Sequence, residues 1–331
     1  MTLILSGGAG FLGSHLLEAL LGQGRTVTVI DNFDPFYPAE AKRRNLAEAG
    51  KAGDFRLVET DIGDADRCLA ALALKPGDVE VLVHLAARAG PRPSVREPQL
   101  YVRLNVGGTV GALELARRLE VPRFIFASSS SVYGARTEVP FREDDPAVTP
   151  VSPYAATKRG GELLCYSYHA LTGMSVVVLR FFSAYGPRQR PDMAIARFVS
   201  LIDQGMPVPV YGDGSASRDH TYVSDIIAGV MASLTVEVGY EVVNLGDSQA
   251  VRLDELIALV EETVGKRAQI DRRPAQPGDV PVTCADITKA RRLLGYDPQV
   301  PIAEGLRRYV AWYQSQALPP GASRGARQEG R

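Results

Sequence analysis

Short apolar runs alternate with stretches of helical period along most of this chain. The runs occupy residues 2–6, 26–31, 55–59, 79–85, 123–127, 175–180 and 241–245. Continuous runs of this length are typical of strands that a parallel sheet buries on both faces. The helical stretches between them predict a Rossmann-type, doubly wound α/β fold, with helices on both faces of the sheet.

The pattern changes after about residue 183, where proline and glycine become frequent. Helical periods at 190–205 and 251–265 predict a second, smaller α/β domain. We expect the Rossmann domain to cover residues 1–182 plus about 220–247, because the segment 222–245 reads as a return to the main sheet. The smaller domain then covers about 183–219 plus 248–315. Residues 316–331 are polar and lack an apolar period, so we expect a disordered tail.

A glycine turn follows the first predicted strand. Gly7, Gly10 and Gly13 are spaced three residues apart before an apolar helical period. Such glycines allow a tight turn, close approach of a pyrophosphate and close helix–strand packing, with the phosphates at the helix N-terminus. The next strand ends in Asp31, which can hold ribose hydroxyls and would repel a 2′-phosphate. With 32 glycines in the chain a chance triplet is possible, but the flanking strand and helix favour an NAD site.

Tyr154 and Lys158 lie four residues apart and would share one face of a helix. An ammonium beside a phenol favours the phenolate, which is a base usable near neutral pH. Ser129, at a predicted strand end, can hydrogen-bond the same substrate oxygen. A Tyr-x-x-x-Lys pair also arises by chance on solvated helices. Its combination with the glycine turn indicates oxidation of an alcohol by a nicotinamide.

Composition excludes several other classes of function. The formal net charge of −1 and the pI near 6.5 give no support for nucleic acid or an anionic membrane as the main partner. No apolar run approaches the roughly 18 residues of a membrane span. The three dispersed cysteines, Cys68, Cys165 and Cys284, suit a reducing cytoplasm. The four histidines lack ligand-like spacing, so no metal site is expected.

Motifs along residues 1 to about 315 resemble the extended short-chain dehydrogenases/reductases of the nucleotide-sugar 4-epimerase type. They are GGAGFLG, DNF, HLAA, SSSSVYG, YAATK, RFFSAYGP, SRDHTYVSD and LGYDP. The resemblance implies a tightly bound NAD, a UDP-sugar in a cleft between two domains, and a homodimer. The catalytic residues it implies are Ser129, Tyr154 and Lys158. The cofactor residues it implies are Gly7, Gly10, Phe11, Leu12, Gly13, Asp31, Asn32, Lys42, Asp61, Ile62, Leu85, Ala86, Ala87, Asn105, Tyr154 and Lys158, with Asn105 making a hydrogen bond at a strand end.

The residues around Ser129 distinguish reactions within this group. Dehydratases of the group carry Thr-Asp-Glu before Val-Tyr-Gly, and nucleotide-sugar decarboxylases keep a glutamate there. Here the same positions are Ser129, Ser130 and Ser131. Without a carboxyl group at these positions elimination is disfavoured, and the resemblance implies epimerisation at C4.

The strings DNFDPFY, HLAARAGPRPS and FFSAYGPRQRPDMA are similar to UDP-glucuronate 4-epimerases. Those enzymes most often have threonine where this chain has Ser183, which keeps the hydroxyl. Thr283 stands where neutral-sugar epimerases often have a bulkier residue. A neutral UDP-hexose or UDP-N-acetylhexosamine is the alternative substrate, and a non-catalytic dinucleotide-binding regulator is a third reading. The substrate residues implied are Arg92, Ser128, Ser129, Ser130, Ser183, Arg190, Arg218 and Asp279, with Arg190 and Arg218 on the diphosphate; for Arg92 a structural salt bridge is an equal alternative.

Overall fold

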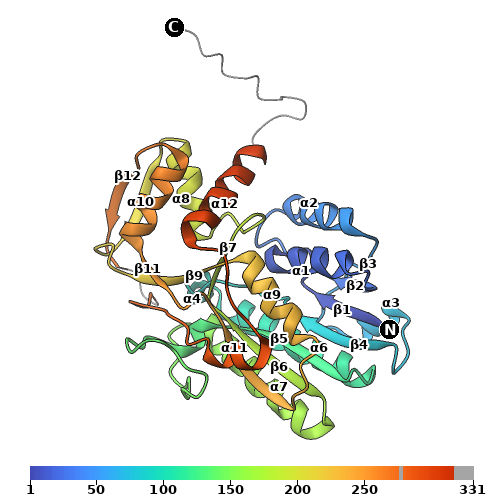
Figure 1. Cartoon of the computed structure of the whole chain (residues 1–331). Coiled ribbons are helices and arrows are strands. Elements are labelled where there is room, and N and C mark those ends of the chain that lie inside the picture. Colours follow the sequence, from blue (N-terminus) through green and yellow to red (C-terminus); the bar gives the residue numbers. More distant parts are fainter. Residues whose placement is uncertain (276–278, 317–331) are drawn as a thin grey trace.

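A seven-stranded parallel sheet forms the centre of the larger domain (Figure 1). The computed structural model describes residues 1–275 and 279–316. The strand order is β10-β6-β5-β4-β1-β2-β3. The strands are β1 (Thr2–Ser6), β2 (Val27–Ile30), β3 (Arg56–Val58), β4 (Val79–His84), β5 (Arg123–Ser129), β6 (Ser175–Phe181) and β10 (Tyr240–Leu245). Each of the seven predicted strands is therefore present, and the segment 222–245 does return to the main sheet.

Two apolar cores lie on opposite faces of this sheet, because alternate strand residues point to opposite sides. Leu3 and Leu5 belong to one core, whereas Ile4 belongs to the other. The first core is covered by α1 (Phe11–Gly22), α2 (Ala39–Ala49) and α9 (Val223–Ser233). The second is covered by α3 (Ala65–Leu72), α6 (Gly108–Arg118) and α7 (Pro153–Thr172). Helices on both faces confirm the doubly wound fold.

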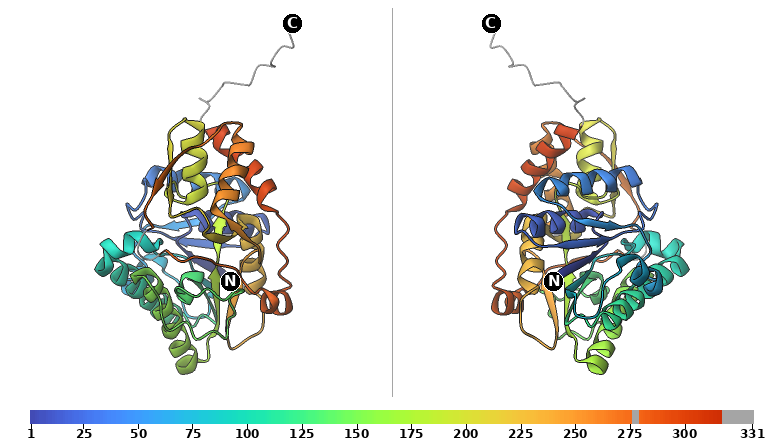
Figure 2. Two further views of the ribbon diagram at one scale, coloured as in Figure 1. Left: turned by 90° about the vertical axis from the view of Figure 1, so that its left-hand side faces the viewer. Right: turned by 90° about the vertical axis from the view of Figure 1, so that its right-hand side faces the viewer.

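Most helices of the predicted smaller domain gather beyond one end of the main sheet, as both views of Figure 2 show, whereas its helix α11 (Thr288–Leu294) packs against β10 and α9. Its helices α8 (Ala194–Asp203) and α10 (Leu253–Val264) lie inside the two predicted helical stretches. It also holds β7 (Ser183–Tyr185), β8 (Pro207–Tyr211), β9 (Ser217–Tyr222), β11 (Ala250–Arg252), β12 (Gln269–Arg273), α11 (Thr288–Leu294) and α12 (Ile302–Gln316). The strands pair as a three-stranded sheet, β11-β9-β7, and a two-stranded sheet, β12-β8.

Short helical segments lie between the longer elements. They are η1 (Gly50–Ala52), α4 (Pro91–Arg96), α5 (Pro98–Tyr101), η2 (Val102–Gly107, a π-helical segment) and η3 (Ser130–Tyr133). Gln316 ends α12, so the expected tail does not begin at residue 316. The remaining residues of that expectation, 317–331, lie outside the described residues.

The order of the strands places a crevice at the end of β1. From β1 the chain winds through β2 and β3 to one side and through β4, β5, β6 and β10 to the other. Connections that leave in opposite directions open a gap at the carboxyl ends of the strands, where ligands bind in such sheets. The predicted motifs of β1, β2, β4 and β5 all follow or end these strands, so the fold brings them to one edge.

Candidate active site

The glycine turn is packed too tightly for side chains. Gly7 has a φ of +77°, and a Cβ on it would lie 2.6 Å from the backbone nitrogen of Ala86. A Cβ on Gly13 would lie 2.1 Å from the carbonyl oxygen of Gly7. Gly10 caps α1 without a side-chain hydrogen bond, which leaves the first amides of the helix free for a phosphate. This geometry fits the pyrophosphate of a dinucleotide.

Asp31 stands at the end of β2, beside the glycine turn. Its carboxylate accepts hydrogen bonds from the backbone amides of Ala9 at 3.0 Å and Phe33 at 2.9 Å. Burial raises the pKa of Asp31, and these amides together with the charge of Lys42 lower it in part. A carboxylate fixed in this way suits the ribose hydroxyls of a dinucleotide.

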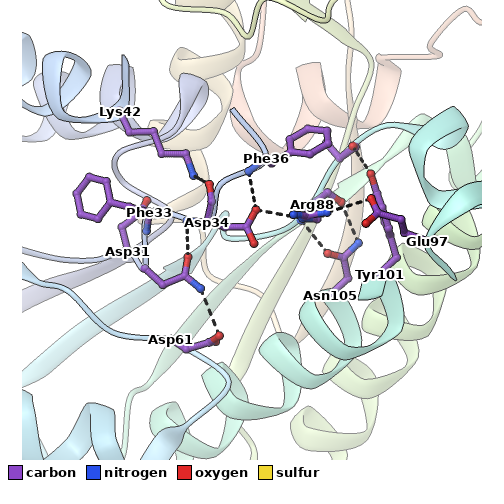
Figure 3. Close-up of polar contacts among 12 residues, drawn as sticks. Asp31, Phe33, Asp34, Phe36, Lys42, Asp61, Arg88, Glu97, Tyr101 and Asn105 are labelled. Carbon is purple, nitrogen blue, oxygen red and sulfur yellow. Dashed lines mark hydrogen bonds and ion pairs between the residues drawn. The ribbon is translucent and has the colours of Figure 1, made fainter. Parts of the chain in front are cut away.

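Neighbouring polar groups continue this end of the cleft. The Nδ2 of Asn32 donates to Asp61 Oδ2 at 3.2 Å, and the Nζ of Lys42 donates to the carbonyl oxygen of Asp34 at 2.8 Å (Figure 3). Asn105 lies in η2 and is bound to the chain just after β4. Its amide accepts from the N–H of Arg88 and donates to the carbonyl of Arg88. The expected strand-end hydrogen bond of Asn105 is therefore present, although its side chain does not line the cavity.

Ser129, Tyr154 and Lys158 meet at the inner wall of the cleft. Ser129 is the last residue of β5, and Tyr154 lies in the first turn of α7, one turn before Lys158. The first turn is fixed by the Ser152 cap and by the hydroxyl of Ser94, which accepts from the Tyr154 amide at 3.0 Å. All three predicted catalytic side chains line one cavity.

Burial opposes charge on both ionisable members of this trio. It raises the pKa of Tyr154, while the Ser129 hydroxyl and the guanidinium of Arg190 lower it in part. Burial lowers the pKa of Lys158 to about 8. The Nζ of Lys158 donates to the carbonyl oxygen of Ala127 at 2.7 Å, so the expected direct effect of the lysine on the phenol stays a prediction for the complex with cofactor.

A buried ion pair supports the strand end behind Ser129. Arg180 on β6 donates to both carboxylate oxygens of Glu162 at 2.8 Å, and the Ser128 hydroxyl donates to the same carboxylate at 2.6 Å. Glu162 lies one turn after Lys158 on α7. The carboxylate thus ties α7 to the ends of β5 and β6, which fixes the spacing between Lys158 and Ser129.

The cavity has a volume of about 510 Å³, within the range of small-molecule sites. Most of the predicted residues line it: Gly7, Gly10, Phe11, Leu12, Gly13, Asp31, Asn32, Lys42, Asp61, Ile62, Leu85, Ala86, Ala87, Ser128, Ser129, Ser130, Tyr154, Lys158, Ser183, Arg190 and Arg218. Residues that sequence reasoning did not select also line it, among them Asp34, Phe36, Tyr37, Arg88, Gln189 and His220. Asp34, Phe36 and Tyr37 lie within five residues of Asn32, and this nearness is the signal that could have found them.

Two predicted substrate residues pair with each other instead of lining the cavity. The guanidinium of Arg92 donates to both carboxylate oxygens of Asp279, at 3.1 and 2.6 Å. It also lies 4.4 Å from the centre of the Tyr211 ring. The pair joins α4 to the smaller domain, as the alternative reading of Arg92 expected.

The hydroxyl of Thr283 accepts a hydrogen bond from the Asp219 amide at 3.3 Å.

Comparison with known proteins decides the family. A family model described as GDP-mannose 4,6 dehydratase matches residues 4–309. A protein named UDP-glucuronate 4-epimerase from Thermodesulfobacterium geofontis (strain OPF15) is 40% identical over 310 residues, which cover 93% of this chain and 95% of that protein. This chain belongs to the extended short-chain dehydrogenase/reductase family of nucleotide-sugar epimerases. The predicted resemblance is thereby confirmed.

Solved structures of this epimerase family share the fold over nearly their whole length. The UDP-glucuronic acid 4-epimerase from Bacillus cereus, in complex with UDP-glucuronic acid and NAD, superposes with a TM-score of 0.88 at 36% identity, covering 96% of this chain and all of that one. A UDP-glucose 4-epimerase from Thermotoga maritima with UDP-glucose gives 0.86 at 30% identity, covering 96% and 99%. The fold is thus common to structures that hold UDP-glucuronic acid and UDP-glucose.

Among residues 1–275 and 279–316 no three His, Cys, Asp or Glu side chains gather as a metal site. No helix within these ranges has the length and apolar character needed to cross a bilayer.

Proposed function

We propose that this protein is an NAD-dependent 4-epimerase that interconverts UDP-glucuronate and UDP-galacturonate. The observation that carries the proposal is the meeting of Ser129, Tyr154 and Lys158 with the glycine turn in one cavity. The serine run supports epimerisation over elimination, although the matching family model is named for a dehydratase. Ser129, Ser130 and Ser131 offer hydroxyls, not carboxyl groups, beside the sugar.

The residues of the cleft fit NAD. Gly7, Gly10 and Gly13 would meet the pyrophosphate, Asp31 would hold the adenine ribose, and Lys158 would hold the nicotinamide ribose. NAD held by these residues would supply the acceptor, and then the donor, of a hydride at C4 of the sugar. Because the same hydride comes back, the cofactor has to stay bound throughout the cycle.

Tyr154 supplies the base. Its phenolate takes the proton of the C4 hydroxyl, and the Ser129 hydroxyl donates a hydrogen bond to the same oxygen. The 4-keto sugar then turns about its diphosphate and presents its opposite face. On return, Tyr154 donates its proton to the new C4 oxygen, so that no proton is gained or lost over the cycle.

Two arginines of the cavity can bind the anionic groups of the substrate. Arg218 is half-buried, and burial lowers its pKa, an effect that Asp279 opposes. It stays the candidate for the diphosphate. Arg190 lies close enough to Tyr154 to act on the phenol. This position favours the sugar end of the cleft over the diphosphate that the family resemblance suggested.

A glucuronate brings a hazard that the site has to control. A ketone at C4 is β to the C6 carboxylate, and such keto acids lose carbon dioxide readily. Hydrogen bonds from Ser130 and Ser183, which both line the cavity, can hold the carboxylate away from alignment with the ketone. The guanidinium of Arg190 can also hold the C6 carboxylate in this orientation, by a charge-assisted hydrogen bond.

We further propose a cytoplasmic homodimer with the two domains divided as the sequence predicts. All three cysteines are free, which suits a reducing compartment. Because β10 lies in the main sheet, this division makes the chain cross three times between the domains. The second crossing falls after Tyr222, where β9 ends and α9 begins, close to the predicted residue 220.

The test is a parallel assay with UDP-glucuronate, UDP-glucose and UDP-N-acetylglucosamine, read by chromatography and mass spectrometry. UDP-glucuronate should give UDP-galacturonate of unchanged mass, with only traces of UDP-pentose. The Tyr154→Phe variant should bind UDP-sugar yet turn over about 10² to 10⁴ times more slowly, the usual contribution of acid–base catalysis. UDP-pentose as the main product, or conversion of UDP-glucose alone, would contradict the proposed substrate.

A further inference from the structure

Phe36 carries two guanidinium groups against its ring. The carbon Cζ of Arg88 and that of Arg190 each lie 5.3 Å from the ring centre. These distances fall within the range of cation–π attraction. Phe36, Arg88 and Arg190 all line the cavity. The aromatic ring is therefore the common support of two cations that belong to distant parts of the chain.

The ring is fixed to the segment that follows Asp31. The Phe36 amide donates to Asp34 Oδ1 at 3.0 Å, and Arg88 Nε donates to the same oxygen at 3.0 Å (Figure 3). Lys42 holds the carbonyl oxygen of Asp34, and Arg88 also reaches Glu97 at 3.2 Å. Phe36 thus has a defined place at the boundary between the dinucleotide half of the cavity and the sugar half.

On its own segment, Arg190 is held by an ion pair with Asp192. Its guanidinium donates to both oxygens of Asp192, at 2.9 and 3.0 Å. The Asp192 side chain is 46% exposed, so solvent weakens this pair and a substrate anion can compete for the guanidinium. A cation–π contact uses the face of the guanidinium, so its N–H groups can still donate hydrogen bonds to a substrate anion that displaces Asp192.

We propose that Phe36 is a positioning residue that holds Arg190 toward the anionic sugar of the substrate. This inference rests on the proposed function, because it takes the C6 carboxylate as the group that Arg190 meets. The proposed role of Phe36 would link the dinucleotide half of the cavity to the sugar half. The segment that would hold the adenine ribose also orients the arginine that selects a charged sugar.

The chain offers a matched control in the same segment. Phe33 also carries a guanidinium against its ring, that of Arg43 at 4.3 Å. Arg43 pairs with Glu59, and both side chains are more than half exposed. Neither Phe33 nor Arg43 lines the cavity. A general disturbance of this segment would affect both phenylalanines, whereas the proposed role belongs to Phe36 alone.

The experiment compares Phe36→Leu, Phe36→Tyr and Phe33→Leu in the NAD-loaded enzyme. Phe36→Leu should raise the KM for UDP-glucuronate about three- to tenfold, as expected for the loss of one cation–π contact, with kcat within about twofold. The inhibition constant of UDP, which has no sugar, should not change. Phe36→Tyr, which keeps the ring, should restore the KM, and Phe33→Leu should leave it as in the parent. Phe36→Met serves as a second non-aromatic variant should the leucine variant lose NAD.

Three outcomes would overturn the inference in an enzyme that converts UDP-glucuronate. The first is an unchanged KM in both non-aromatic variants, and the second is an equal rise in the inhibition constant of UDP. The third is the same KM rise in Phe33→Leu. If the parent protein does not convert UDP-glucuronate at all, the proposed function fails instead, so the two failures can be told apart.

Discussion

At the scale of single residues, burial works against the charges that the chemistry needs. Tyr154 has to lose a proton in a site where burial raises its pKa, and Lys158 has to keep one where burial lowers its pKa. Ser129 and Arg190 partly offset the first effect, and the charge of the Glu162 carboxylate partly offsets the second. The working pH range of the enzyme should therefore be bounded on its alkaline side by Lys158.

The pH profile of the NAD-loaded enzyme tests this bound. The Lys158 ammonium is present below its pKa of about 8 and is lost above it, so kcat/KM should fall as pH rises through about 8. An arginine at position 158 stays charged to a much higher pH than the lysine. The Lys158→Arg variant should turn over more slowly, but its kcat/KM should not fall as pH rises through about 8. If kcat/KM of the arginine variant falls over the same pH range, the fall is caused by a group other than Lys158.

At the scale of elements, the strand–turn–helix unit β1–α1 depends on close packing at two glycines. Gly13→Ala would bring a methyl group to 2.1 Å from the Gly7 carbonyl oxygen, so the helix has to move away from the turn. We expect a loss of about 1–3 kcal/mol of stability, the usual effect of overpacking, and weaker retention of NAD. Thermal unfolding and the NAD content of the purified protein measure the two effects.

Gly22, at the other end of α1, is the control for this prediction. A Cβ there would meet nothing within 4 Å, and alanine is favoured over glycine in a helix by up to about 1 kcal/mol. Gly22→Ala should therefore keep NAD and unfold at the same or a higher temperature. Similar NAD loss in both variants would show that α1 tolerates neither change, contrary to the packing argument.

At the scale of the whole molecule, α6 and α7 lie side by side and leave apolar positions uncovered. Val110 on α6 is exposed by 36% and Leu163 on α7 by 55%, and Val102, in the segment η2 that precedes α6, is exposed by 52%. On α7 the exposed or half-exposed positions Ala156, Gly160, Leu163 and Ser167 recur at helical spacing, which gives one small, weakly polar face. Such a face suits helix–helix packing against a second copy of the chain.

Light scattering of the purified protein should give the mass of two chains. Leu163→Asp should shift it toward one chain, because a carboxylate would be buried without a partner in the proposed interface. Met206→Asp is the control, since Met206 is 50% exposed between α8 and β8 in the smaller domain. A dimer that persists in Leu163→Asp would place the interface elsewhere.

The sequence by itself determined the larger domain and its chemistry. Strand length, helical period and glycine spacing are local patterns, so β1, the turn at Gly7 and the placement of Asp31 followed from neighbouring residues alone. The four-residue spacing of Tyr154 and Lys158 likewise fixed their common helix face, because an α-helix repeats at that interval. The strand ends then placed Ser129 at the same edge of the sheet.

Only the tertiary structure decided how residues from the two domains meet. Arg92 and Asp279 pair although they are 187 residues apart. The sequence around either residue does not predict its contact with the other. The same holds for Arg190, whose stacking on Phe36 and nearness to Tyr154 depend on how the smaller domain closes over the sheet. Contacts of this kind depend on how separate elements pack against each other. The periodicity of apolar residues along the sequence predicts the elements but not these contacts.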